Sequence, residues 1–152
     1  MGTTRRLDPE ALHRELRRAL RHGARASRLL RFTPYLAELI FPAELNSDLT
    51  IHDRAIQAEL LLRRALEAIG GKRGDAASIL LCLTPGTLGT TLEARRQSAA
   101  GLLGILPDTL RRERHEGLLL WDVAMEVYGL VTSTERVSPQ QCQIEQGAPP
   151  HG

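Results

Sequence analysis

Aromatic residues are scarce in this sequence and make up 3% of its 152 positions. Leucine, isoleucine, valine and alanine must therefore fill the core almost alone. The hydrophobic content of 42% and the charged content of 25% are both ordinary for a globular protein. Leucine and alanine are good helix formers. The composition thus favours an all-α fold, and the length fits a single domain.

Cysteine is also scarce, with Cys82 in an apolar run and Cys142 in a polar stretch. Two cysteines cannot form a disulfide framework and indicate a reducing compartment. The N-terminus is basic, but no apolar stretch follows it, so we expect no signal peptide. No run approaches the roughly 18 apolar residues of a membrane span. These absences predict a cytoplasmic protein without membrane contact.

Sequence patterns of catalysis and of metal binding are missing. The five histidines and two cysteines show no metal-ligand spacing. The glycine-rich residues 70–74 lack the phosphate-loop pattern, so they are interpreted as a helix stop and a loop, with Asp75 capping the next helix. No serine lies in a nucleophile elbow, and the carboxylates are scattered singly. The sequence therefore predicts no enzyme, no metal and no cofactor.

Positive charge is concentrated at one end of the chain although the net charge is only +2. The first 31 residues contain nine arginines and three acidic residues. Arginine outnumbers lysine 19 to 1, which a GC-rich bacterial genome explains as readily as selection for bidentate contacts. The basic first helix either exposes a solvated face or contacts phosphates or an acidic partner. Leucines alone on its apolar face argue against a membrane-surface helix.

Apolar periodicity and capping residues predict a compact bundle of about five or six helices. Asp8 and Pro9 start the first helix, and Thr50 caps a helix over residues 51–69. Thr90 and Glu93 form a capping box for a helix over residues 91–103, and Pro107 starts a last helical region that reaches about Tyr128. We expect a helical domain over residues 1–131 and a disordered tail over 132–152, where periodicity vanishes.

One stretch contains the spacing of a DNA-binding motif. A helix-turn-helix needs a small residue in its first helix, a glycine in the turn and apolar anchors in the second helix. Ala99 and Ala100, then Gly104, then Leu110 satisfy these needs. Residues 91–116 therefore resemble the helix-turn-helix superfamily. The sequence departs from the pattern at Glu113, where a second apolar anchor usually stands, and no strand-rich wing follows.

The resemblance implies a transcriptional regulator that reads double-stranded DNA with the helix from Asp108. An arginine fork can pair with both acceptors of guanine. Two copies of the chain would match a palindromic site. The implied base contacts are Thr109, Arg111, Arg112 and His115, and the implied phosphate contacts are Arg95, Arg96 and Arg114.

A second interpretation remains open, because any two helices joined by a glycine turn produce much of this pattern. The chain would then be a non-enzymatic adaptor that docks on a protein partner through an apolar groove or the basic first helix. The positions of Arg111, Arg112 and His115 separate the two interpretations. Their joint exposure beside Arg95 and Arg96 favours DNA, and burial under the first helix favours the adaptor.

Overall fold

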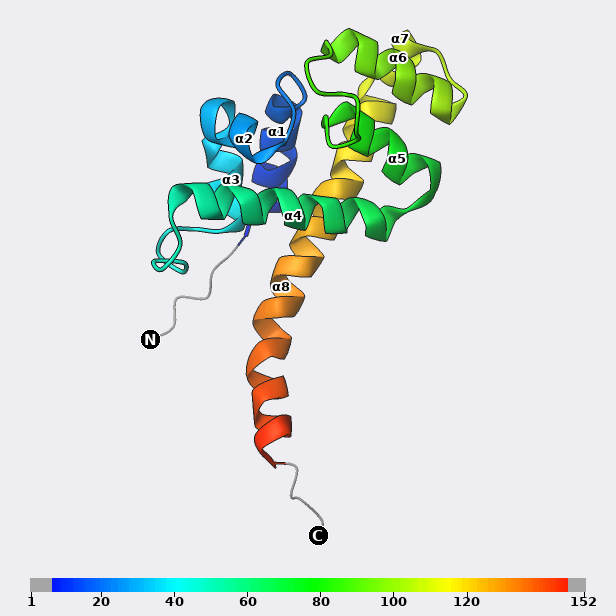
Figure 1. Ribbon diagram of the computed structural model, residues 1–152. Coiled ribbons are helices and arrows are strands. Elements are labelled where there is room, and N and C mark those ends of the chain that lie inside the picture. The colour runs from blue at the N-terminus through cyan, green and yellow to red at the C-terminus, as the bar shows by residue number, and fades with distance from the viewer. Residues whose placement is uncertain (1–6, 148–152) are drawn as a thin grey trace.

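The computed structural model describes residues 7–147, with side chains described as far as Ser133, and it is all-α over that range. Figure 1 shows a bundle from which the last helix projects. The described part contains eight α-helices and one π-helical turn, more than the five or six expected because several of them are short. The elements are α1 Pro9–Ala19, α2 Ala26–Phe32, α3 Pro34–Ile40, α4 Ile51–Ile69, α5 Gly71–Leu80, α6 Leu92–Leu103, α7 Pro107–Leu110, η1 Glu113–Gly117 and α8 Leu118–Gly147.

Two of the predicted helix starts are confirmed by side-chain caps. The carboxylate of Asp8 accepts a hydrogen bond from the backbone N–H of Glu10 at 3.0 Å, and Pro9 is the first residue of α1. Thr50 accepts from the backbone N–H of Asp53 at 3.1 Å while the Asp53 carboxylate accepts from that of Thr50. This reciprocal capping box satisfies two backbone donors and fixes the start of α4.

Two local predictions were wrong. Residues 71–74 form the first turn of α5 and not a loop, because Gly70 reverses the chain with φ +66° and Asp75 then lies inside the helix. A Cβ on Gly74 would lie 2.7 Å from the Leu66 carbonyl oxygen, so glycine lets this turn press on the end of α4. The cap of α6 is Thr91, which accepts from the Ala94 N–H, and not Thr90.

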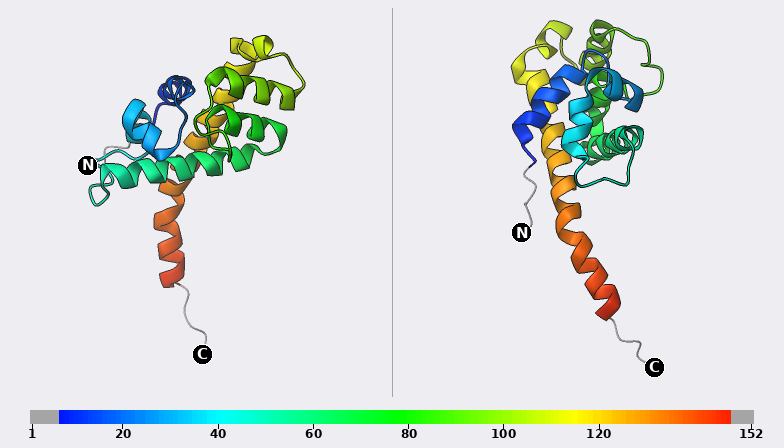
Figure 2. Two further views of the ribbon diagram at one scale, coloured as in Figure 1. Left: turned by 45° about the horizontal axis from the view of Figure 1, so that its top comes forward. Right: turned by 90° about the vertical axis from the view of Figure 1, so that its left-hand side faces the viewer.

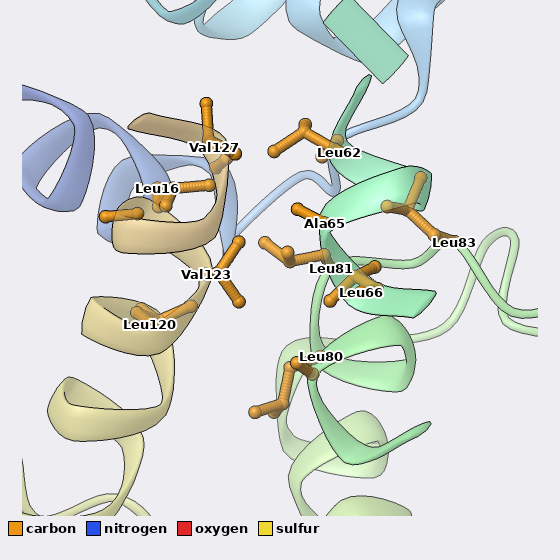
Figure 3. Packing of buried hydrophobic residues seen from close by; sticks show 14 of the residues in the cluster. Leu16, Leu62, Ala65, Leu66, Leu80, Leu81, Leu83, Leu120, Val123 and Val127 are labelled. Carbon is orange, nitrogen blue, oxygen red and sulfur yellow. The ribbon is translucent and has the colours of Figure 1, made fainter. Parts of the chain in front are cut away.

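The core lies where α4 crosses α8, with α1 and α5 closing it. Figure 3 shows Leu62 and Ala65 of α4 facing Val123 and Val127 of α8. Leu62, Ala65 and both valines are 0% exposed. No aromatic side chain in the described part is fully buried, so aliphatic residues fill the core as the composition predicts.

The last helix, α8, has two parts with different surroundings. Its first turns belong to the core, and Val131 is its last buried side chain in the described range. Beyond that point the helix projects from the bundle as far as Gly147 (Figures 1 and 2). The predicted tail thus begins directly after this last buried side chain of the described range, although the helical backbone continues past residue 132. Residues 148–152 of that tail lie outside the described residues.

Candidate nucleic-acid interface

The turn after α6 has the features that the sequence predicts. Gly104 ends α6 in the left-handed region with φ +73°, which glycine adopts without strain. The N–H of Ile105 then donates to the Ala100 carbonyl at 3.0 Å and closes the end of the helix. Ala100 and the apolar anchor Leu110 are both 0% exposed. The turn glycine, the small residue and the first anchor therefore occupy their predicted places.

The helix predicted from Asp108 is wrong in its length. α7 ends at Leu110, and Arg112 is extended with ψ 147° before the π-helical turn η1 leads into α8. A helix stays on the body of a protein through apolar residues three or four positions apart. Glu113, three residues after Leu110, is exposed and supplies no such contact. The break therefore coincides with the missing second anchor.

Residues 111–115, which we call the basic segment, are exposed between two buried positions. The side chains of Arg111, Arg112, Arg114 and His115 all project to solvent, whereas Thr109 on α7 is half-buried. Leu110 anchors one end of the segment, and Glu116, 5% exposed, anchors the other. Four of the predicted contact residues are thus accessible together on one short, anchored stretch.

Arg95, predicted as a DNA phosphate contact, is 2% exposed and lies inside the bundle. Its guanidinium donates to the carbonyl of Leu20 at 2.8 Å, to that of Arg21 at 3.3 Å and also to that of Leu80. These carbonyls end α1 and α5, where backbone acceptors have no partner in the helix. Burial lowers the pKa of Arg95 by removing water from the charged form. Arg95 joins three helices.

Arg96, predicted as a phosphate contact, has its guanidinium engaged by Glu116. Two parallel hydrogen bonds of 2.8 Å each join them. The side chains are 20% and 7% exposed, respectively. Hydrogen bonding to Glu116 raises the pKa of Arg96, against the opposing effect of burial. This pair fastens η1 to α6 and fixes the end of the basic segment that Glu116 anchors.

A signal in the sequence could have identified both interior arginines. Arg95 precedes the buried Ala99 by four positions, and Arg96 precedes the buried Ala100 by four. Residues four apart share a helix face. The two arginines therefore had to lie on the face that the small residues bury.

The basic helix α1 lies beside the basic segment, where Arg95 and Arg96 were expected. His13 Nε2 lies 2.9 Å from the Gly117 carbonyl, and its ring lies 4.7 Å from that of Trp121. Arg17 forms an exposed ion pair with Glu113. The right-hand view of Figure 2 shows α1 (dark blue) alongside the first turns of α8 (yellow). The exposed Arg14 belongs to this same helix.

Fold and site define an all-α bundle with a basic, exposed turn between two of its helices. Within the described residues, no cluster of His, Cys, Asp and Glu has the make-up of a metal site, and no helix has the length and apolar character that crossing a bilayer requires. Comparison of the chain with family models, curated proteins and solved structures finds no match.

Proposed function

We propose that the chain binds double-stranded DNA with the basic segment. The observation that carries this proposal is the joint exposure of Arg111, Arg112, Arg114 and His115 between buried anchors. An anchored segment loses little conformational freedom on binding, so more of its contact energy appears as affinity. Arginine forks match both phosphate oxygens and the acceptor edge of guanine.

The surroundings of the basic segment support an anionic ligand. Its one carboxylate, that of Glu113, is offset by the ion pair with Arg17. Arg14, one turn earlier on α1, is exposed and extends the positive surface, whereas Arg18, 66% exposed, is paired with the buried Glu15 at 3.1 Å. In this proposal α1 takes over the phosphate contacts first assigned to α6. We further propose that two copies bind a palindromic site and that the chain acts there as a transcriptional regulator.

Removing two arginines of the basic segment tests the proposal. On a duplex of mixed sequence, which offers no preferred bases, we assign Arg111 and Arg112 to phosphates. We therefore expect the Arg111→Ala/Arg112→Ala variant to bind such a duplex about 30-fold or more weakly at low salt, because each lost phosphate contact also loses its counterion release. Fluorescence anisotropy of a labelled duplex measures this. The matched control is Arg64→Ala/Lys72→Ala, which removes two exposed charges from α4 and α5. Equal loss in both variants would contradict a role specific to the segment.

Docking on a protein partner is the second candidate, and an apolar hollow between α3 and α4 favours it. The hollow has a volume of about 280 Å³. Tyr35 and Ile51 on its rim are 51% and 53% exposed. Exposed apolar side chains that gather at a concavity mark interaction sites more often than scattered ones do. Its lining residues are Leu30, Pro34, Tyr35, Ala37, Glu38, Ile51 and Arg54.

The adaptor candidate predicts that Tyr35→Ser/Ile51→Ser abolishes capture of a protein partner while the fold persists. Substitutions at such exposed positions change stability by about 0.5 kcal/mol or less. Affinity capture from extract of the source cells, followed by mass spectrometry, measures the loss. Leu45→Ser/Leu88→Ser, at leucines 58% and 61% exposed elsewhere, serves as the control. Capture of the same proteins by all three forms would rule out the apolar hollow as the docking site.

A further inference from the structure

A small basic hollow lies between the α1–α2 connection and the loop that precedes α6. Its volume is about 180 Å³. Four arginines and a histidine line it, together with the loop of residues 88–90, and no acidic side chain of the described residues does so. It is separate from the basic segment and shares no residue with it. The basic lining residues are Arg21, His22, Arg25, Arg28 and Arg95.

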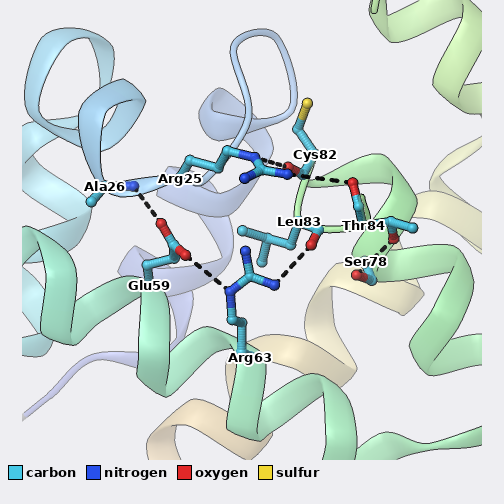
Figure 4. A network of polar contacts seen from close by, with 8 residues as sticks. All are labelled: Arg25, Ala26, Glu59, Arg63, Ser78, Cys82, Leu83 and Thr84. Atoms are coloured by element: carbon cyan, nitrogen blue, oxygen red, sulfur yellow. Dashed lines mark hydrogen bonds and ion pairs between the residues drawn. The ribbon is translucent and has the colours of Figure 1, made fainter. Parts of the chain in front are cut away.

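One wall of the hollow is held rigidly by hydrogen bonds to the loop after α5. Arg25 donates to the Cys82 carbonyl at 2.9 Å and to the Thr84 carbonyl at 3.4 Å. Arg63 donates to the Leu83 carbonyl at 2.8 Å. Figure 4 shows both arginines directed at this loop. Arg25 thus fixes the loop through backbone carbonyls, and no carboxylate of the described residues neutralises its charge.

Arg95 brings a buried, incompletely satisfied cation to the same hollow. The residue is 2% exposed, and its Nε is buried without a hydrogen-bond partner among the described residues. The hydrogen-bond acceptors of its guanidinium are backbone carbonyls, and no carboxylate of the described residues pairs with it. Burial of a cation without a counter-charge costs free energy, which agrees with the lowered pKa of Arg95. An anion in the hollow would supply the missing charge.

Two more arginines at the rim are available to such an anion. Arg21 is exposed and has no acidic partner in the described part of the chain. The Arg28 guanidinium lies 5.9 Å from the centre of the Phe32 ring, on which His22 stacks at 3.7 Å. These aromatic contacts orient Arg28 without neutralising it.

We propose that this hollow binds a single phosphate group, carried by a small phosphorylated ligand or by free phosphate. Guanidinium forks are the side chains best matched to phosphate. The N-terminus of α6, which Thr91 caps, directly follows Thr90 of the lining and adds the positive end of a helix dipole nearby. The volume is below the roughly 300–1,000 Å³ of pockets for drug-sized ligands. At roughly 30 Å³ per water molecule it accommodates a tetrahedral anion and a few waters.

Titration of the full chain with inorganic phosphate, against chloride at equal ionic strength, tests this proposal. We expect saturable binding by isothermal calorimetry and phosphate-dependent shifts of the Gly89 and Thr90 amide resonances in a ¹H–¹⁵N spectrum. Arg21→Gln/Arg28→Gln should lower the affinity at least about tenfold, because both substitutions remove charge-assisted hydrogen bonds to the anion. The control Arg64→Gln/Lys72→Gln should bind phosphate as the wild type does. Circular dichroism verifies that both variants fold.

The remaining arms identify the source of the phosphate and separate this site from DNA binding. Glycerol 1-phosphate that binds at least tenfold more tightly than inorganic phosphate indicates an ester ligand, and equal affinity indicates the free anion. Arg111→Ala/Arg112→Ala should leave phosphate affinity unchanged, even if DNA binding fails altogether. Responses equal to those with chloride, or the same loss in both glutamine variants, would overturn the proposal.

Discussion

Replacing Arg95 with methionine is expected to destabilise the protein by about 3 kcal/mol or more. Methionine keeps an unbranched apolar stem but leaves three backbone carbonyls, those of Leu20, Arg21 and Leu80, without their donor. A buried acceptor left unsatisfied costs about 1–3 kcal/mol. Loss of the arginine's own burial cost offsets part of this sum. The melting temperature should fall by about 6–12 °C in thermal denaturation followed by circular dichroism.

The same substitution at an exposed arginine shows whether the loss of stability is specific to the buried Arg95. Arg64→Met removes an exposed arginine from α4, and its effect should stay within about 0.5 kcal/mol. Hydrogen exchange adds a local readout, because Arg95→Met should release protection at the ends of α1 and α5 first. An Arg95→Met variant as stable as Arg64→Met would contradict the joining role assigned to Arg95.

Gly23→Ala is expected to destabilise the protein by about 2–4 kcal/mol. Gly23 has φ +90°, and a Cβ there would lie 2.6 Å from the Cβ of Cys82 and 3.3 Å from the Leu81 carbonyl oxygen. The left-handed backbone costs an alanine about 1–2 kcal/mol, and overpacking adds about 1–3 kcal/mol. At this contact the α1–α2 connection packs directly against the end of α5. Neither backbone segment can easily move away to make room for the added Cβ. Urea denaturation measures the loss.

Two further variants divide the Gly23→Ala effect into its causes. Gly86→Ala has a similar φ of +85° with no atom within 4 Å of the added Cβ, so it should cost only the backbone strain. Adding Cys82→Gly to Gly23→Ala removes the clashing Cβ and relieves φ +63° at a non-glycine residue, so it should restore part of the stability. Equal losses for Gly23→Ala and Gly86→Ala would show that the close approach contributes nothing.

Helices whose limits depend on local chemistry were predictable from the sequence. Thr50 and the glycine pair after Ile69 define α4 through capping and through loss of helix propensity, and the structure places α4 over those residues. The turn at Gly104 was predictable for the same reason, since left-handed φ favours glycine. The start of α5 directly after Gly70 was not, because it depends on the contact of Gly74 with the end of α4.

The candidate site was predictable only where it is exposed. Exposure of the basic segment follows from its polar sequence, and the break before η1 coincides with the missing apolar anchor at Glu113. The pairing of Arg96 with Glu116 is a tertiary contact that no local pattern predicts. The basic hollow joins residues 21–28 to residues 88–95, a long-range approach that no local pattern contains. The charge pattern of the sequence thus predicted the basic surface of the first helix. Tertiary packing determined which arginines face solvent.

The salt dependence of DNA affinity tests the central proposal most directly. Log affinity falls with log salt by about 0.9 for each phosphate that the protein neutralises. Anisotropy titrations of a mixed-sequence duplex between about 50 and 200 mM salt would compare the wild type with Arg111→Ala/Arg112→Ala. Two lost phosphate contacts predict a slope shallower by about 1.8 for the variant. Parallel slopes, or no binding by the wild type at the lowest salt, would contradict DNA binding through residues 111–115.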